Sequence, residues 1–486
     1  MDYGGSVWHS AGPIMKFDKF SSNLLTETGF FVSSSVIFAG SFVVNVLNYV
    51  FTLVMSRILG VEHFGEVAAL LSLFLVLSVP ATALTMLMAR EAAHYQEEGS
   101  GVRQLFMRMR KYSLIGAIAL WVIFLAFAPF VSEYLRIPTL PIYIFSLLLP
   151  LTVLGALQSG TLQGLQEFLA LSYQGGLGTI VKLAASVALV AAGFSVAGVM
   201  GALVLASLCG LIYGYFRTRS LLLHPEVSEE SSEALAKEGK SINVQLIARL
   251  FGSILLTTFL LTLLSNVDVL LAKHYLSPEF AGHYGALSTV GKILIYGVGA
   301  FITVLLPMAA AAYARGEGEE RKMLWLSLGA VAGASLAAFV VFSAFPHLVV
   351  SLLFGNRYTD IAEHLGTFTI AMACIALATT FINYFVATRN TSFVYLLGIG
   401  IATEVALIAL YHDSLGAITL SLVLSSALLL FLMVANYFVA YRAPSPDRVQ
   451  KSRDARRGEG GRGGVYGDTT TSTQGPRNEA DGVFER

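Results

Sequence analysis

The segment that decides the fold is RILGVEHF at residues 57–64, which leads into VAAL at residues 67–70. A related segment, KHYLSPEF at residues 273–280, leads into YGAL at residues 284–287. In both places the segment begins with a basic residue and follows a long apolar run. The two copies indicate that the second half of the chain repeats the first.

Further positions match at the same offset. A shift of about 217 residues sets Pro80 against Gly297, and nearly the same shift sets GFSVAG at residues 193–198 against YHDSLG at residues 411–416. Proline and glycine can each loosen a helix at such a position. Unrelated apolar helices also match by chance, but matches at one offset favour duplication.

The composition is that of a membrane protein. Hydrophobic residues make up 55% of the chain and charged residues 13%, and the mean hydropathy is +0.70. These values exclude an ordinary soluble domain. The formal net charge of zero and the lack of a nucleic-acid motif give no reason to expect nucleic acid as a partner.

Apolar stretches of about 20 residues recur, and a helix of that length crosses roughly 30 Å of hydrocarbon. They lack the alternation of polar and apolar residues that an outer-membrane barrel strand has. The sequence therefore predicts an all-α polytopic membrane protein with about twelve transmembrane helices. The predicted spans are 32–56, 65–88, 113–131, 141–163, 174–194, 197–216, 249–272, 283–307, 324–345, 363–387, 393–411 and 414–441.

Six spans in each half predict two six-helix bundles related by a pseudo-two-fold axis along the membrane normal. Such repeats place a substrate site between the bundles near the midplane, which is the plan of a transporter. The predicted organisation also includes a tail too polar and glycine-rich to fold on its own. Its parts are an N-terminal segment (1–31), a first bundle (32–216), a cytoplasmic linker (217–248), a second bundle (249–441) and a disordered cytoplasmic tail (442–486).

The distribution of lysine and arginine predicts the orientation, because positively charged loops stay on the cytoplasmic side. With the N-terminus inside, the predicted outer loops hold only Arg57, Arg136, Lys273 and Arg357 of the 31 basic residues. Residues 1–31 have no short apolar region ending in a cleavage site, so no cleaved signal peptide is expected. We expect a multi-pass protein of the cell membrane with both termini in the cytoplasm.

Two segments carry a family resemblance. SRILGVEHFGEVAAL at residues 56–70 resembles the polysaccharide biosynthesis or oligosaccharide flippase family, which belongs to the larger group of multidrug, oligosaccharidyl-lipid and polysaccharide exporters. LLFGNRY at residues 352–358 is similar to the LFG-x-x-Y pattern of that family. The resemblance covers roughly residues 30–440. It implies a MATE-like fold with a central cavity, and alternating access that moves a lipid-linked oligosaccharide between leaflets.

Two lysines are candidates for binding an anionic cargo. A charge at the bilayer centre costs about 2.5–3.5 kcal/mol on insertion scales, so charges within spans are functional candidates. Lys182 and Lys292 lie near the middle of their spans, one in each half. Together they could hold the pyrophosphate of a polyprenyl-linked sugar. Alternatively, each lysine pairs with a carboxylate and stabilises helix packing.

Two carboxylates are candidates for ion coupling. Glu404 aligns with Ser186, one turn from Lys182, so we expect Lys182 and Glu404 to face the same interior. Glu404 could carry a proton or compensate a lysine. Asp268 follows Asn266, and the pair could bind Na⁺ or a proton, or form an interhelical hydrogen bond.

Three further residues complete the candidate set. Asn48 on the first span could bind sugar hydroxyls, although a hydrogen bond between helices is the alternative. Arg57 and Lys273 occupy equivalent positions at the predicted outer side. They could form a gate by pairing with nearby acidic residues, or their side chains could extend to the lipid headgroups. The acidic candidates are Glu62, Glu66 and Glu279.

The chain has no P-loop, HExxH, Cys/His metal spacing or GxSxG element, so we expect neither an enzyme nor a cofactor. An H⁺ or Na⁺ gradient, the membrane potential or consumption of the product would then drive transport. The expected partners are the lipid-linked oligosaccharide, membrane lipids, and a polysaccharide polymerase or glycosyltransferases. The alternatives are an ion-coupled drug or cation antiporter of the same fold, and a membrane glycosyltransferase or polymerase, which the short outer loops disfavour.

Overall fold

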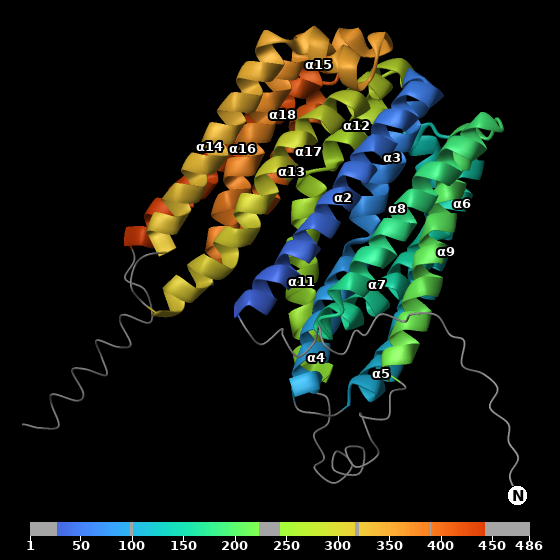
Figure 1. The fold of residues 1–486 in the computed structure, drawn as a ribbon. Coiled ribbons are helices and arrows are strands. Elements are labelled where there is room, and N and C mark those ends of the chain that lie inside the picture. Colours follow the sequence, from blue (N-terminus) through green and yellow to red (C-terminus); the bar gives the residue numbers. More distant parts are fainter. Residues whose placement is uncertain (1–26, 98–100, 223–243, 316–319, 389, 443–486) are drawn as a thin grey trace, which may run out of the picture. The chain divides into compact units, whose positions relative to one another are not determined.

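The computed structural model describes residues 27–97, 101–222, 244–315, 320–388 and 390–442. Every regular element in these ranges is helical (Figure 1), which confirms the all-α fold. The predicted N-terminal segment and linker lie mainly outside the described residues, and so does the tail apart from its first residue.

The first half contains eight helices within the described residues. They are α2 (Glu27–Leu59), α3 (Val61–Leu77), α4 (Val79–Glu97), α5 (Val102–Leu135), α6 (Thr139–Ser146), α7 (Leu148–Gly164), α8 (Phe168–Ala191) and α9 (Ser195–Leu222).

The second half contains eight α-helices and a 3₁₀ helix in the part that the structure describes. They are α11 (Val244–Leu264), α12 (Val267–Tyr275), α13 (Pro278–Arg315), α14 (Glu320–Ala344), α15 (Pro346–Leu353), η1 (Asn356–Ile361), α16 (Ala362–Ala387), α17 (Phe393–Leu410) and α18 (Leu415–Arg442).

The number of membrane spans is close to the prediction. Among the described residues, nine helical segments are long and apolar enough to cross a membrane, and eleven spans result if two bent helix pairs each count as one. The remaining predicted span, 283–307, lies within α13, whose 38 residues exceed the roughly 20 that a span needs. A count of twelve stays a prediction.

The two bent spans have different local causes. The bend of 42° between α3 and α4 falls just before Pro80, which is tolerated in the first turn of a helix. The bend of 46° between α11 and α12 falls at Ser265 and Asn266. Both side chains donate to carbonyls one turn back, at 3.2 Å and 2.8 Å, and such bonds compete with the helix backbone. Gly297, the repeat equivalent of Pro80, lies inside the continuous helix α13.

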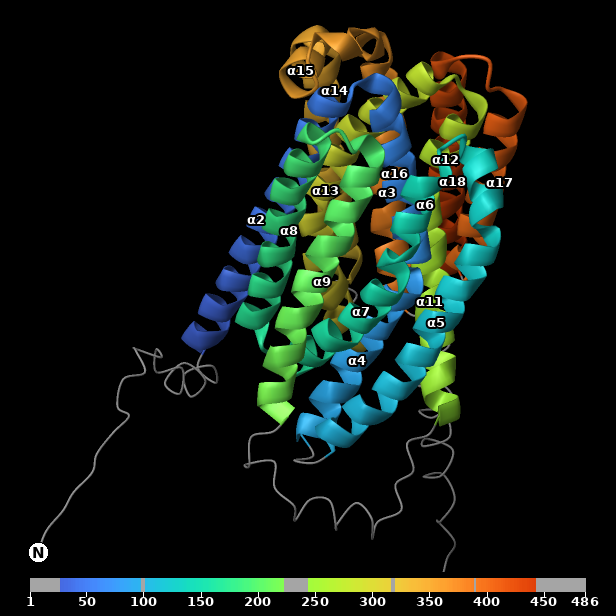
Figure 2. The same cartoon turned by 90° about the vertical axis from the view of Figure 1, so that its right-hand side faces the viewer.

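The pattern of helix pairing recurs in the two halves. In the first half α2 packs against α8, and α4 packs against α7. In the second half α11 and α12 pack against α17, and α13 packs against α16. Figures 1 and 2 both show α2 running beside α8. This places Lys182 of α8 next to α2, and Glu404 of α17 next to α12.

The halves meet along α3, α4 and α5 of the first half and α11, α12 and α13 of the second. The described residues up to Val434 form one compact unit, and a second begins at Ala435, of which only the end of α18 is described. The bundle boundaries at residues 216 and 249 remain predictions.

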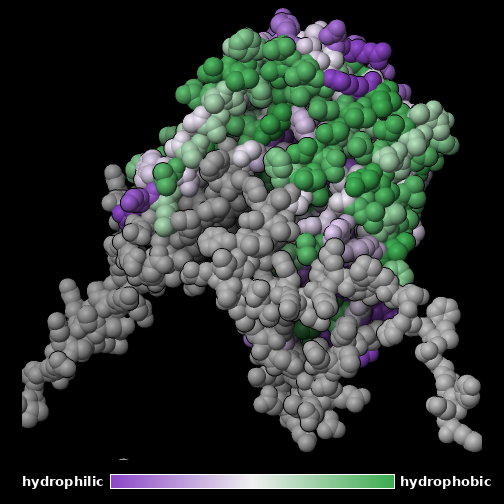
Figure 3. Space-filling model, in the orientation of Figure 1, coloured by the Kyte–Doolittle hydropathy of each residue, from purple (hydrophilic) through white to green (hydrophobic). Residues whose placement is uncertain are grey.

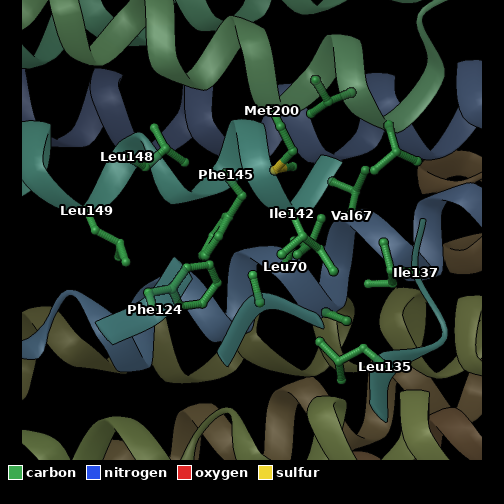
Figure 4. Close-up of a cluster of buried hydrophobic side chains, with 14 of the residues drawn as sticks. Val67, Leu70, Phe124, Leu135, Ile137, Ile142, Phe145, Leu148, Leu149 and Met200 are labelled. Carbon is green, nitrogen blue, oxygen red and sulfur yellow. The ribbon is translucent and has the colours of Figure 1, made fainter. Parts of the chain in front are cut away.

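One buried apolar cluster lies in the first half (Figure 4). The ring of Phe145 on α6 contacts that of Phe124 on α5, with centroids 5.4 Å apart, and both lie near Leu70 of α3 and Met200 of α9. Lipid is as apolar as these side chains, so close packing rather than escape from water supplies their stabilising effect.

Apolar side chains also cover much of the described surface on the face seen in Figure 3. On α5, for example, Ile115, Val122 and Phe130 are each more than half exposed. An exposed apolar helix face of this length is expected for a chain whose solvent is lipid.

Small residues allow α7 to approach α4 closely. A Cβ at Gly160 would lie 2.6 Å from the carbonyl oxygen of Thr85, and a Cβ at Gly164 would lie 2.5 Å from that of Ala89. Gly155, on the same helix, has open space at this position. Glycine is therefore required at the first two positions and not at the third.

We expect Gly160→Ala to destabilise the protein by about 1–3 kcal/mol, because an added methyl group forces the two backbones apart. Gly155→Ala is the matched control and should be neutral or stabilising, since alanine favours helix. Thermal unfolding of the purified proteins in detergent measures the difference. Equal melting temperatures for the two variants would contradict this account of the α4–α7 contact.

Candidate functional site

A group of buried polar side chains lies within the second half, and we call it the Asp268 cluster. It consists of Asn266, at the break between α11 and α12, Asp268 on α12, Tyr284 and Lys292 on α13, and Glu404 on α17. Asp268 is 1% exposed, and Tyr284 and Glu404 are 0% exposed. Lys292 is half-buried and is the most accessible of the three charged members.

Hydrogen bonds satisfy only part of this cluster. Tyr284 Oη donates to Asp268 Oδ2 at 3.0 Å, and Lys292 Nζ donates to Asn266 Oδ1 at 3.3 Å. Within the described residues, Asp268 Oδ1 and both carboxylate oxygens of Glu404 have no hydrogen-bond partner. Three buried acceptor atoms therefore remain open, which is costly unless something else fills their coordination.

Electrostatic interactions connect the charged members. Lys292 interacts with both Asp268 and Glu404, and the two carboxylates interact with each other. Two acids and one base leave one negative charge uncompensated when all three are ionised. A single proton or monovalent cation would neutralise the cluster.

The second candidate lysine lies in a different setting. Lys182 on α8 donates a hydrogen bond to Asn48 Oδ1 on α2. Its ammonium also lies 4.3 Å from the centre of the Phe51 ring, within the range of a cation–π interaction. Neither partner carries a negative charge, so these contacts hold the lysine in place without neutralising it.

The structure thus divides the predicted site residues between two places. Lys182 and Asn48 contact each other in the first half, whereas Lys292, Asp268 and Glu404 gather in the second. Glu404 and its repeat equivalent Ser186 are both 0% exposed, in agreement with their predicted equivalence. Sequence reasoning missed Tyr284, which lies two turns before Lys292 on α13, a spacing that indicates a shared helix face.

The start of α3 packs directly against the start of α13. A Cβ at Gly65 would lie 2.8 Å from the backbone nitrogen of Gly282, and a Cβ at Gly285 would lie 2.8 Å from Cβ of Ala68. These are repeat-related pairs, because the offset that aligns the halves sets Gly65 on Gly282 and Ala68 on Gly285. Equivalent helix starts therefore contact each other across the pseudo-two-fold relation, as surfaces do in a symmetric dimer.

The two family-like segments meet beside this contact. Phe64 packs edge-on against Phe354 and Tyr358, with ring centroids 6.1 Å apart in both pairs. Tyr358 Oη donates to the backbone oxygen of Ser56 at 3.0 Å. Gly355, whose φ of 90° suits glycine, makes the turn between α15 and η1 that brings Phe354 and Tyr358 together.

The proposed gate residues also lie at this boundary. Arg57 on α2 donates a hydrogen bond to the backbone oxygen of Leu352 on α15. Lys273 on α12 is 3% exposed and interacts electrostatically with Glu66 and, more weakly, Glu62 of α3. Both basic residues thus connect one half to the other. We call this end of the helices the Arg57 end.

No group of three or more His, Cys, Asp or Glu side chains suited to a metal ion is found in the part of the chain that the structure describes. The Asp268 cluster, with two carboxylates, an amide and a phenol, could take a proton or an Na⁺ ion through its open oxygens. Oxygen ligands of this type suit hard cations.

The fold and the buried charges define a polytopic membrane protein of the transporter type. Residues 32–312 match the family described as polysaccharide biosynthesis protein. The chain belongs to this family. No curated protein matches the sequence.

Solved structures support the fold. An inward-facing multidrug resistance MATE family transporter of the MOP superfamily superimposes with a TM-score of 0.69 at 12% identity, over 83% of this chain and 96% of that one. The lipid II flippase MurJ in an inward closed conformation gives a TM-score of 0.63 at 12% identity, over 85% and 89% of the two chains. A MOP superfamily transporter from Pyrococcus furiosus gives 0.60 at 13% identity, over 83% and 94%. The MATE-like fold is confirmed.

We expect Tyr284→Phe to cost about 1–3 kcal/mol of stability, because it leaves a second buried oxygen of Asp268 without a donor. Tyr296→Phe, on the exposed side of the same helix, is the matched control and should have little effect. Thermal unfolding in detergent compares the two. A variant at position 284 as stable as the control would show that Asp268 does not depend on this hydrogen bond.

We expect Gly282→Val to push the starts of α3 and α13 apart, because the new side chain meets the backbone and side chain of Val61. Gly297→Val lies in open space on the same helix and is the control. Spin labels are placed at the exposed positions His63 and Glu279 after Cys209 and Cys374 have been replaced by serine. Pulsed electron paramagnetic resonance then measures the distance between the two labels. An unchanged distance distribution in the Gly282 variant would rule out this contact as the point where the halves close.

Proposed function

We propose that this protein is a flippase that moves a polyprenyl-linked oligosaccharide across the cell membrane by alternating access, without chemical change to its cargo. The family, whose description is polysaccharide biosynthesis protein, supports an envelope saccharide as the cargo. One of the similar structures is that of a lipid II flippase, which supports flipping as the activity.

The observation that carries the proposal is the setting of Lys182. The ammonium lies within a membrane-spanning helix and is held by an amide oxygen and a ring face, both uncharged. This half-buried cation has no ion-pair partner among the described residues, which is costly in a membrane, and an anionic headgroup would relieve that cost. The diphosphate of a polyprenyl-linked sugar is such a group, and its tail can remain in the lipid while the head crosses.

We assign the remaining predicted residues roles that are consistent with the passage of this headgroup. Lys292 is the second cationic contact for the cargo, and Asn48 both positions Lys182 and offers its amide to sugar hydroxyls. Asp268 and Glu404 take up the coupling H⁺ or Na⁺, which compensates the one negative charge left in their cluster.

Arg57 and Lys273 belong to the gate. The contacts at the Arg57 end join the halves through Gly65, Gly282 and the Phe64 aromatic group. If both termini are cytoplasmic, this end faces outward, and the conformation is one that loads cargo from inside. Polymerases or glycosyltransferases that make and use the cargo are the expected partners in the same membrane.

An ion-coupled antiporter of organic cations is the second candidate, and the MATE transporter likeness supports it. The Asp268 cluster would then be the cation site. Lys182 argues against this reading, since an uncompensated lysine repels a cationic drug.

The test is flipping of a fluorescent polyprenyl-diphosphate sugar in proteoliposomes. We expect Lys182→Ala to slow flipping by roughly tenfold to a hundredfold, because charge-assisted hydrogen bonds contribute about 1.5–3 kcal/mol. Lys292→Ala should act in the same direction. Lys111→Ala, at an exposed position on α5, is the control and should leave the rate unchanged.

A wild-type protein that does not flip this probe but expels organic cations along an ion gradient would replace the flippase with the antiporter. Normal flipping by a well-folded Lys182 variant would remove this lysine from the cargo path.

A further inference from the structure

Because of its position, Lys292 can bind the cargo only under a certain condition. Its ammonium donates to Asn266 Oδ1 at 3.3 Å, two residues from Asp268, and the charges of Asp268 and Glu404 act on it through the interior, so it offsets part of the charge of two buried carboxylates. If Lys292 left the cluster and no other cation replaced it, the two ionised carboxylates would retain two uncompensated negative charges. Burying such a pair in a low-dielectric interior is strongly unfavourable.

The open oxygens show where a replacement could bind. Glu404 is fully buried, and among the described residues neither of its carboxylate oxygens has a hydrogen-bond partner, nor does Asp268 Oδ1. Tyr284 fixes the other oxygen of Asp268, which leaves these three atoms available to a cation. The cluster can therefore accept either the lysine ammonium or an external cation as its counter-charge.

Of the charged members of the cluster, Lys292 is the one whose side chain is partly exposed. Lys292 is half-buried while its two carboxylate partners are closed off, so its flexible four-carbon chain is the link between the cluster and its surroundings. Among the described residues, the titratable groups that act on the cluster are its own members on α12, α13 and α17. On the neighbouring helix α3, Glu66 and Glu62 interact with Lys273.

We propose that Lys292 is a tethered cation that competes with an external monovalent cation, H⁺ or Na⁺, for the Asp268 and Glu404 carboxylates. Uptake of the cation lowers the charge of the two carboxylates from two negative to one, which weakens their attraction for the lysine and frees it to bind the diphosphate of the cargo. This inference rests on the proposed function for the identity of the cargo, but the competition itself does not. Because linkage is reciprocal, cargo binding strengthens cation binding by the same factor.

The competition is tested first without cargo, by following thermal unfolding of the purified protein. Na⁺ is titrated at fixed pH against choline, and in a second series pH is varied without Na⁺, so that the two cations are separated. In Lys292→Met the competitor is gone, and the cation concentration for half-maximal stabilisation should fall by at least about fivefold, the lower end of usual coupling factors. An unchanged concentration in both series would overturn the proposal.

Glu404→Gln is the second variant and keeps the proposal testable if Lys292→Met does not fold. Its cluster has one acid and one base and is already neutral, so stabilisation by either cation should be lost. Retention of the wild-type response in this variant would overturn the proposal. Lys111→Met, which changes an exposed lysine on α5 outside the cluster, should respond like the wild type.

Binding of the cargo is tested with tritiated farnesyl diphosphate. In the wild type its Kd should fall by about fivefold or more on going from low to saturating cation, whereas in Glu404→Gln it should change less than twofold. An equal cation dependence in both proteins would overturn the exchange. If the wild type does not bind this probe although the competition without cargo is observed, the exchange stands and the proposed cargo is wrong.

Discussion

The arrangement of the halves depends on the contact between Gly65 of α3 and Gly282 of α13. Only residues without a side chain let two helix backbones approach this closely, and the pair lies at equivalent positions of the repeat. The Phe64 aromatic group and the attraction of Lys273 by Glu66 both need this approach, because their partners come from opposite halves. The small-residue contact therefore aligns the more specific polar and aromatic contacts beside it.

Because the chain lies in a membrane, its few buried charges indicate its function. A buried charge must be compensated in hydrocarbon, so the partners of each intramembrane ionisable group show what it can do. Lys182 has uncharged partners and remains available to an anion, whereas Lys292 has two carboxylate neighbours and is available only when they are otherwise neutralised. Lys182 and Lys292 look alike in the sequence, but they are available to an anion under different conditions.

Much of the fold could be predicted from the sequence, because long apolar runs in lipid have few structural choices. The bend before Pro80 follows from its missing backbone donor. The segment 346–361 forms α15 and η1, short helices whose apolar residues, LVVSLLF at 348–354, make too short a run to predict a span. The grouping of Asp268, Lys292 and Glu404 could not be predicted, because these residues come from three helices whose neighbours are set by packing rather than by spacing along the chain. The contact between residues 56–70 and 352–358 was equally out of reach, since each motif was visible but their proximity depends on how the halves meet.

Comparison of the two halves shows how a duplicated chain can separate two tasks. Phe51, whose ring faces Lys182, aligns with Asp268 at the repeat offset, and Ser186 on α8 aligns with Glu404 on α17. At these positions the first half has an apolar ring, which lies beside a cation, and a hydroxyl, while the second half has two carboxylates. The same helix pairing, α2 with α8 and α12 with α17, therefore supports opposite local charge. Since like charges in one low-dielectric site repel and opposite ones neutralise each other, an anion path and a cation site are best placed in different halves. Lys292 is a cation that belongs to the same cluster as the two carboxylates of the second half. It is then the residue through which anion transport and cation binding can influence each other.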